Sequence, residues 1–276
     1  GQMCVYGAGT DISKVYTGSY TSPTFIQMNL IGLDSTLTIK SERYSGTAIW
    51  EHNLYENTQS RSKLIDFVDA SLPCFTRIVD TKNTIIFKLK LENYVNVIDN
   101  TKELMVGRVG ESRLLTVPPG LSFYQTYVSQ RIIYSQIFVE GCAQIIKSTE
   151  NKNDLEIVCK PGKSYIKIIG GNELPAVVHN TNLVLDKSTD YFLSNTQQYW
   201  QNFSKYRKQF QSVLTKDVPL KDKLLQTIDD VAILLKCQQS NEGAVIAGYP
   251  HPMGYVRDQY GTSRGMLALG MNTEAK

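Results

Sequence analysis

The sequence predicts a mainly β protein with a C-terminal helical segment, in which a large antiparallel β-sandwich is followed by helices. Three observations lead to this prediction. Apolar and polar residues alternate over short segments, turn-forming residues separate these segments, and beyond about residue 190 the apolar spacing changes from two to three and four. The 276 residues, 42% hydrophobic and 20% charged, suffice for one large globular domain or two ordinary ones.

The strand pattern is clearest at Ile85, Phe87, Leu89 and Leu91, which share one face of an extended chain. The turn-forming cluster at 80–83 precedes this strand and predicts a hairpin with segment 75–79. Further strands are expected at 25–31, 35–40, 47–52, 121–127, 131–139, 155–159, 164–169 and 177–185. Short strands without helices between them predict antiparallel sheets packed face to face, with almost no helix before residue 190.

A helical pattern follows this β region. Aromatic residues recur at spacings of three and four, at Tyr199, Trp200, Phe203, Tyr206 and Phe210. Ser194 or Thr196 is expected to cap the start of this helix, because short hydroxyl side chains favour the N-cap position.

Two more helices are expected toward the end of the sequence. Apolar residues between 224 and 235 predict one that ends near Gly243, since glycine commonly follows a helix. The next begins near Asp258 or Ser263.

The charge and hydropathy of the sequence restrict its partners. The formal net charge of +3 is small, and acidic and basic residues are interspersed, which argues against binding to nucleic acid. No stretch is long and apolar enough to predict a membrane span.

The five cysteines do not form a recognisable motif. None lies in a C-x-x-C pair or near a histidine at ligand spacing, which argues against a metal site, and the odd number does not indicate a disulfide framework. This usage favours a reducing, cytoplasmic compartment. Secretion or a periplasmic location stays open, because Gly1 and Gln2 before Met3 are typical of a trimmed start.

The segment from Gly243 to Asp258 carries the chemistry most suggestive of function. A loop rich in glycine and proline leads to Tyr255, Arg257 and Asp258 at a helix start. A carboxylate and a guanidinium can form charge-assisted hydrogen bonds to vicinal hydroxyls, while an aromatic face covers the C–H groups of a sugar ring. The alternative is structural: Arg257 and Asp258 form an ion pair, or Asp258 is an N-cap.

The same segment resembles glycoside hydrolase family 15, the glucoamylases and related α-glucosidases of prokaryotic type. The resemblance lies in Gly243-Ala-Val-Ile-Ala247 followed by Tyr255-Val-Arg257-Asp258, where the family usually has tryptophan in place of Tyr255. This difference leaves room for another substrate. The resemblance implies a β-supersandwich at 1–190, a helical linker at 191–220 and, at 221–276, the beginning of an (α/α)6 six-hairpin barrel.

Roles for individual residues follow from the resemblance alone. Arg257 and Asp258 would bind the non-reducing sugar, Tyr255 would pack beside its ring, and His251 is a further substrate-binding candidate. The two catalytic glutamates of the family lie downstream, so this chain would hold no catalytic residue and would be inactive alone.

The parent enzyme would hydrolyse terminal α-glucosidic bonds of malto-oligosaccharides or related α-glucans with inversion, without a cofactor or metal. This chain would contact the remainder of its own barrel. Two alternatives stay open: a disaccharide phosphorylase of related architecture, and a non-catalytic carbohydrate-binding or assembly module.

Overall fold

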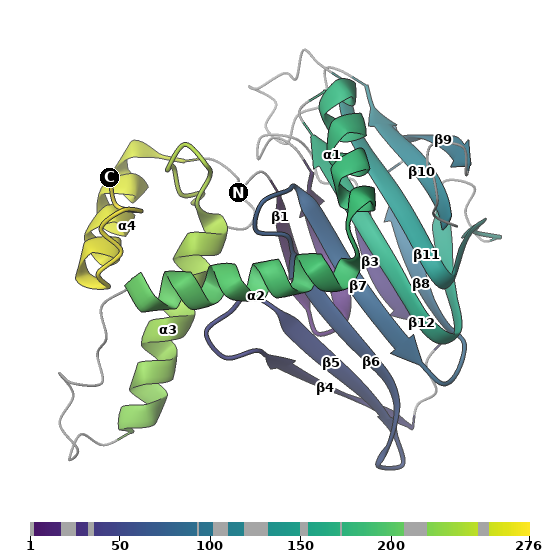
Figure 1. Ribbon diagram of the computed structural model, residues 1–276, viewed down its shortest axis with the longest axis horizontal. Helices are drawn as coiled ribbons and strands as arrows, with labels where there is room; N and C mark the ends of the chain where they lie inside the picture. Colours follow the sequence, from purple (N-terminus) through teal and green to yellow (C-terminus); the bar gives the residue numbers. More distant parts are fainter. Residues whose placement is uncertain are drawn as a thin grey trace.

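The computed structural model describes residues 3–17, 26–32, 36–92, 94–101, 110–118, 132–149, 154–171, 173–206, 220–247 and 254–276. Strands occupy the first part of the chain and helices the last (Figure 1). The strands are β1 (Cys4–Ala8), β2 (Asp11–Tyr16), β3 (Ile26–Ile31), β4 (Leu37–Arg43), β5 (Trp50–Glu56), β6 (Gln59–Val68), β7 (Cys74–Thr81), β8 (Ile85–Leu91), β9 (Asn96–Thr101), β10 (Gly110–Val117), β11 (Ile133–Lys147) and β12 (Leu155–Gly171). The helices are α1 (Leu174–Asp186), α2 (Thr189–Tyr206), α3 (Lys221–Gln238) and α4 (Val256–Ala268).

All described strand pairings are antiparallel and join into one 12-stranded sheet. Its main path runs β1-β2-β3-β8-β12-β7-β6-β5-β4, and β11, β10 and β9 extend from β12. The sheet curves around a large apolar cluster to which both halves contribute, for example Met28 and Phe87 from one half and Leu64 and Val79 from the other. The predicted fold class, an antiparallel β domain followed by helices, is confirmed.

The long hairpin β11–β12 joins the two halves of the sheet. Gly141 and Gly162 have positive φ angles of 79° and 121°, and the register shifts between Gly141 and Ala143. A Cβ on Gly141 would lie 2.3 Å from the carbonyl oxygen of Lys163, so only glycine fits there. The two segments expected at 155–159 and 164–169 are therefore parts of one strand with an irregularity near Pro161.

The predicted hairpin between 75–79 and 85–91 is wrong. Strands β7 and β8 do not pair with each other but lie end to end along β12, which pairs with β8 through 155–159 and with β7 through 162–169. The polar residues at 80–83 connect β7 to β8 without reversing the direction of the chain. Strand β12 is 17 residues long, so one of its edges can form hydrogen bonds to both β7 and β8. The spacing of residues in the sequence does not reveal this arrangement.

The strand expected at 177–185 is also wrong, because this segment forms α1. Pro175 stands in its first turn, where proline is tolerated. Val177 and Val184, seven residues apart, are buried, and Val184 packs with Cys74 and Ile169 against the outer face of the sheet. The β-branched residues suggested a strand, but tertiary packing determines the helix. His179, which we expected in a strand, is exposed on this helix.

Helix α2 begins at Thr189, earlier than expected. The backbone N–H of Tyr191 donates to Ser188 Oγ at 3.2 Å, so Ser188 caps this end and the expected caps Ser194 and Thr196 lie within the helix. Thr196 is buried and its Oγ1 accepts a hydrogen bond from the N–H of Ala70. This contact anchors α2 to the loop after β6.

The last helices pack around a separate small core. Ala232 of α3, Val245 of the following loop and Met266 of α4 are buried together, and Phe203 of α2 packs against them. Figure 1 shows α2 extending from the sheet to α3, with α4 beyond it. Among the described helices, none combines the length and apolar character of a membrane span.

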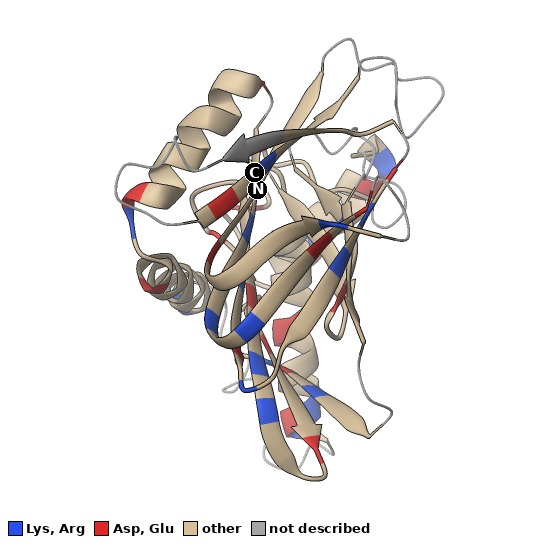
Figure 2. Ribbon diagram, turned by 90° about the vertical axis from the view of Figure 1, so that its right-hand side faces the viewer, with Lys and Arg blue, Asp and Glu red and all other residues tan. Residues whose placement is uncertain are grey.

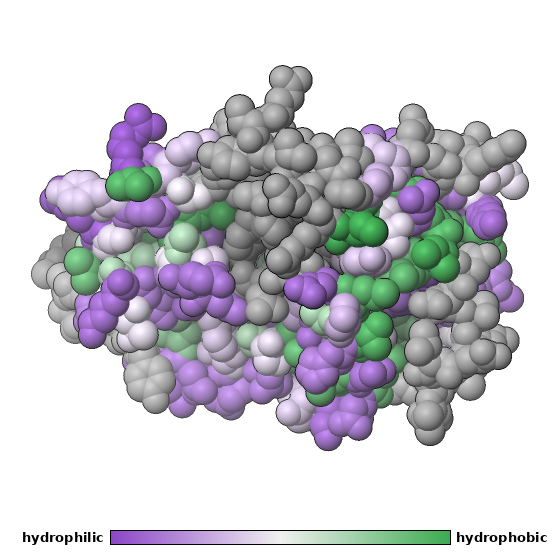
Figure 3. Space-filling model, turned by 90° about the horizontal axis from the view of Figure 1, so that it is seen from above, coloured by the Kyte–Doolittle hydropathy of each residue, from purple (hydrophilic) through white to green (hydrophobic). Residues whose placement is uncertain are grey.

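Most other expected strands agree with the structure within a few residues, although β1, β2, β6, β9 and β10 were not anticipated. The segment 121–127 lies outside the described residues. Figure 2 shows basic and acidic residues interspersed along the strands, in agreement with the small net charge. Figure 3 shows hydrophobic surface gathered mainly over the sheet end of the molecule.

Candidate functional site

The sequence-predicted residues lie at the start of α4. Tyr255 is its N-cap residue, with extended backbone angles and without a side-chain capping bond in the described chain. Asp258 stands in the first turn, where a carboxylate interacts favourably with the positive end of the helix dipole. The structural alternative of Asp258 as the N-cap itself therefore does not hold. His251 lies outside the described residues.

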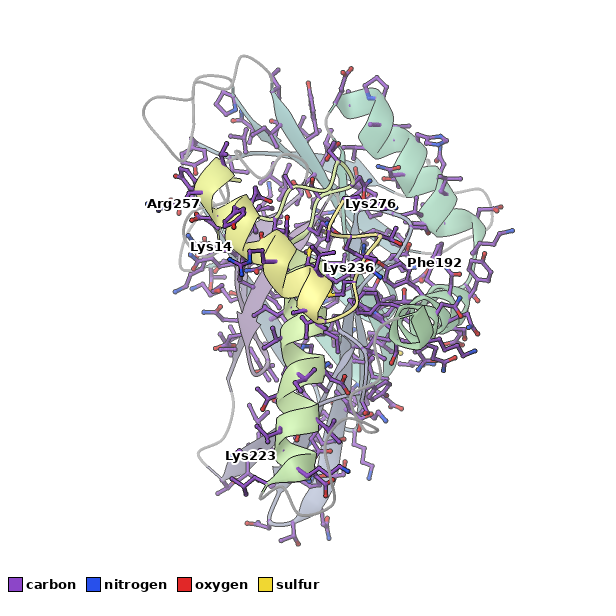
Figure 4. All side chains as sticks on the ribbon, turned by 90° about the vertical axis from the view of Figure 1, so that its left-hand side faces the viewer. Lys14, Phe192, Lys223, Lys236, Arg257 and Lys276 are labelled. Carbon is purple, nitrogen blue, oxygen red and sulfur yellow. The ribbon has the colours of Figure 1, made fainter. Side chains whose placement is uncertain are left out.

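Arg257 and Asp258 form an open surface pair. Arg257 Nε lies 3.5 Å from Asp258 Oδ1, and the side chains are 92% and 34% exposed. Figure 4 shows Arg257 at the outer end of α4, whereas Lys236 lies toward the middle of the molecule. Exposed pairs of this kind contribute little to stability.

Two side-chain amides hold the residues that follow α3. Gln259 of α4 makes two hydrogen bonds to the backbone of Val245, accepting from its N–H and donating to its C=O. Gln239, after α3, donates to the carbonyl oxygens of Gly243 and Glu274. These contacts connect the described residues after α3 with α4 and with the C-terminal segment.

A second candidate site is a cavity of about 920 Å³ between the sheet and the helices, which no sequence motif indicated. Strands β1, β5 and β6 form one side of it, and α2, α3 and the C-terminal residues form the other. Its volume is within the range of small-molecule pockets, roughly 300–1,000 Å³.

His52 and Asp66 line the sheet side of this cavity and are connected through a chain of polar contacts to Ser41 and Arg77, which are not among its lining residues. Arg77 binds Asp66 through two hydrogen bonds, from Nε to Oδ1 at 2.7 Å and from Nη2 to Oδ2 at 2.5 Å. His52 Nε2 lies 3.4 Å from the same carboxylate, and His52 Nδ1 lies 2.8 Å from Ser41 Oγ. Arg77 also donates to the carbonyl oxygen of Thr10, which links the two halves of the sheet.

The electrostatics of this chain keep Asp66 ionised. Burial alone raises the pKa of Asp66, but the Arg77 guanidinium and the hydrogen bond from His52 outweigh burial and hold that pKa below its ordinary value. The carboxylate therefore remains an acceptor for Arg77 over the physiological range of pH.

Aromatic rings supply the apolar part of the cavity. Trp50 stacks on His52 with ring centroids 6.5 Å apart and an interplanar angle of 3°. Trp200 meets Tyr199 edge to face at 5.3 Å. The sequence contains two tryptophans, and both line this cavity.

Ion pairs join the sheet, α3 and the C-terminal segment around the cavity. Arg43 at the end of β4 pairs with Asp230 of α3, and Lys236 Nζ lies 3.2 Å from Glu274 Oε1. These contacts fix the helical side of the cavity relative to the sheet side.

Sequence reasoning missed the cavity because its residues come from distant segments. A signal was nevertheless present: Asp66 and Arg77 are charged residues at inward positions of otherwise apolar strands. His52 falls in the strand expected at 47–52. In the described part of the chain, no group of three or more His, Cys, Asp or Glu side chains could hold a metal ion.

Comparison with known proteins supports the fold. The structure is similar to that of a bacterial glucoamylase complexed with acarbose, with a TM-score of 0.61 and 10% sequence identity. The similarity covers 99% of this chain and 46% of the glucoamylase, so the chain spans less than half of that protein's length. No family model and no curated protein matches the sequence. At this identity, the comparison shows a shared glucoamylase-like fold.

Proposed function

We propose that this chain is the N-terminal part of a glycoside hydrolase related to glycoside hydrolase family 15. The similarity to the bacterial glucoamylase over 99% of the chain carries this proposal, because it spans the β domain and the helices alike. The proposed domains are a β-supersandwich at 1–190, which includes α1, a helical linker at 191–220, and the beginning of a helical barrel at 221–276.

Tyr255, Arg257 and Asp258 have the chemistry of a sugar subsite. Asp258 accepts hydrogen bonds from sugar hydroxyls, Arg257 donates to them, and Tyr255 packs beside the ring. The exposure of Arg257 supports this role, since its guanidinium is open to a substrate. His251 is a further candidate in the same loop.

Catalysis requires groups that this chain does not supply. Inverting hydrolysis needs one protonated and one ionised carboxyl group, about 6.5–9.5 Å apart, on either side of the scissile bond and a water molecule. In the proposed enzyme these carboxyl groups come from the remainder of the barrel. Its substrate is a malto-oligosaccharide or a related α-glucan.

Exposed apolar residues support contact with further helices. On α3 and its N-cap, Leu220, Leu224, Val231 and Leu234 follow helical spacing and are exposed. On α4, Val256, Tyr260 and Leu267 do the same. Apolar stripes at this spacing bury themselves between packed helices, as the rest of a barrel would provide.

The test is the reaction of the longer protein with maltotriose, measured with and without inorganic phosphate. We expect glucose in both conditions, and NMR of the first product should show the β-anomer. Glucose 1-phosphate formed only with phosphate would identify a phosphorylase instead. The present chain alone should release no glucose above a buffer control, and measurable release would contradict the assignment of catalysis to the remainder of the barrel.

A further inference from the structure

Not all polar groups in and next to the wall of the cavity between the sheet and the helices are satisfied. In the described part of the chain, Oδ2 of Asp69, which lines the cavity, and Nη1 of Arg77, which binds the lining residue Asp66, are buried and have no hydrogen-bond partner. Asp69 is held rigidly, because its Oδ1 accepts from the N–H groups of Ser71 and Leu72 and from Ser71 Oγ. Unsatisfied buried polar groups are rare in proteins and costly, so their presence beside a cavity calls for an explanation.

Stability alone does not explain this polar chain. Buried ion pairs such as Arg77–Asp66 can often be replaced by apolar residues without loss of stability. The same inner face of the sheet is otherwise filled with aliphatic and aromatic side chains. Perturbed ionisable groups beside a cavity are typical of functional sites.

The charge around the cavity points to a neutral ligand. Asp66 is paired with Arg77, Asp230 with Arg43, and Glu274 with Lys236. Of the other charged lining residues, Glu242 and Lys276 are exposed and opposite in sign. The wall therefore has no excess of positive charge, and the Asp69 carboxylate disfavours an anion.

The remaining lining combines uncharged polar groups, aromatic rings and aliphatic side chains such as Val5, Ile12 and Ile233. Ser240, Asn241 and Thr273 contribute hydroxyl and amide groups, and Trp50 and Trp200 contribute aromatic surface. Trp50 is 43% exposed, and its ring lies parallel to that of His52, with the ring centroids 6.5 Å apart. An accessible ring beside hydroxyl and amide groups suits a ligand with many hydroxyls and apolar C–H faces.

We propose that this cavity binds a short neutral oligosaccharide, with the ring of Trp50 as its stacking platform. The identification of the ligand as a sugar rests on the proposed function, whereas its neutral and hydroxylated character is inferred from the cavity.

Intrinsic fluorescence tests this site in the present chain. Because both tryptophans line the cavity, excitation of tryptophan reports on it without a label. Titration with maltotriose should give a saturable change. In Trp50→Ala, in which Trp200 remains as the reporter, the apparent affinity should fall at least about tenfold. Tyr191→Ala removes an exposed aromatic side chain of α2 outside the cavity and should bind like the wild type.

Isothermal titration calorimetry of the wild type and the variants checks the location of the binding site independently of fluorescence. Circular dichroism verifies that each variant is folded. The hydrolysis assay measures catalysis by the longer protein, whereas this titration measures binding to the present chain, so the two proposals can fail separately. Three results would overturn the proposal: no binding of maltotriose by the folded wild type, equal affinity in folded Trp50→Ala, or binding of a cationic amine such as spermidine in place of maltotriose.

Discussion

Two arginine–aspartate pairs in this molecule differ in almost every physical respect. Arg257 and Asp258 are adjacent in sequence, exposed and joined at 3.5 Å by one contact. Arg77 and Asp66 lie on neighbouring strands, are 0% and 8% exposed, and share two short hydrogen bonds. The exposed pair is open to solvent, whereas the buried pair lies in the interior, where Asp66 lines the cavity. The same two residue types therefore form a surface contact in one place and part of the protein interior in the other.

The largest expected effect is at the buried pair. Arg77→Met should lower the free energy of unfolding by about 3–5 kcal/mol, because it leaves the Asp66 carboxylate buried without its partner. The double variant Asp66→Leu/Arg77→Met should recover much of this loss. Urea denaturation of the wild type and both variants measures these differences. A loss below about 1 kcal/mol in Arg77→Met would show that the pair is not buried as described.

Acid should weaken the fold through the same carboxylate. Since the folded-state pKa of Asp66 lies below its unfolded value of about 3.9, the stability that it contributes is present above about pH 4 and is lost as the pH falls through the folded pKa. Unfolding free energies measured from about pH 5 to pH 2 should therefore decline more steeply in the wild type than in Asp66→Asn. If the curves of the wild type and Asp66→Asn are parallel, Asp66 does not account for the loss of stability in acid.

Thiol labelling compares the cavity with the open surface. Burial raises the pKa of Cys4 to about 11 and that of Cys237 to about 12, and both line the cavity, while Cys142 is exposed. Since the thiolate is the reactive form, Cys142 should react with iodoacetamide at pH 8 much faster than the other two. Mass spectrometry of peptides after timed labelling measures the order. Cys4 or Cys237 reacting first would mean that the cavity opens readily.

The smallest stability effect is expected at the exposed pair. Arg257→Ala in the present chain should change the free energy of unfolding by no more than about 0.5 kcal/mol, since an exposed pair contributes little. The same urea denaturation serves as the measurement, with Arg77→Met as the contrasting variant. A loss of 2 kcal/mol or more would reveal a structural role for Arg257.

The sequence predicted the order of β and helical parts because local periodicity determines it. The face shared by Phe87 and Leu89 is one example. The prediction from the sequence failed at α1, where packing against the sheet overrides the strand preference of Val177 and Val184. The prediction also failed at β7 and β8, whose relation depends on β12, where their partner residues lie 66 to 95 residues further along the chain.

The two candidate sites differ in the same respect, since one could be identified from the local sequence and the other could not. Arg257 and Asp258 could be identified because they are adjacent in sequence and follow a Gly- and Pro-rich loop. The cavity could not be predicted, since Trp50, Asp66 and Trp200 come together only through the sheet register and the docking of α2. An inward charged residue such as Arg77 was the one local sign of it.

The most direct test of the account is steady-state kinetics of Asp258→Asn in the longer protein with maltotriose, together with a thermal melt. We predict that kcat/KM falls at least about tenfold, equivalent to about 1.4 kcal/mol, while Tm stays within about 2 °C of the wild type. Arg257→Ala should behave alike. Unchanged kinetics in Asp258→Asn, with any loss confined to the melt, would contradict a sugar-binding role and reduce the pair to a helix-terminal ion pair.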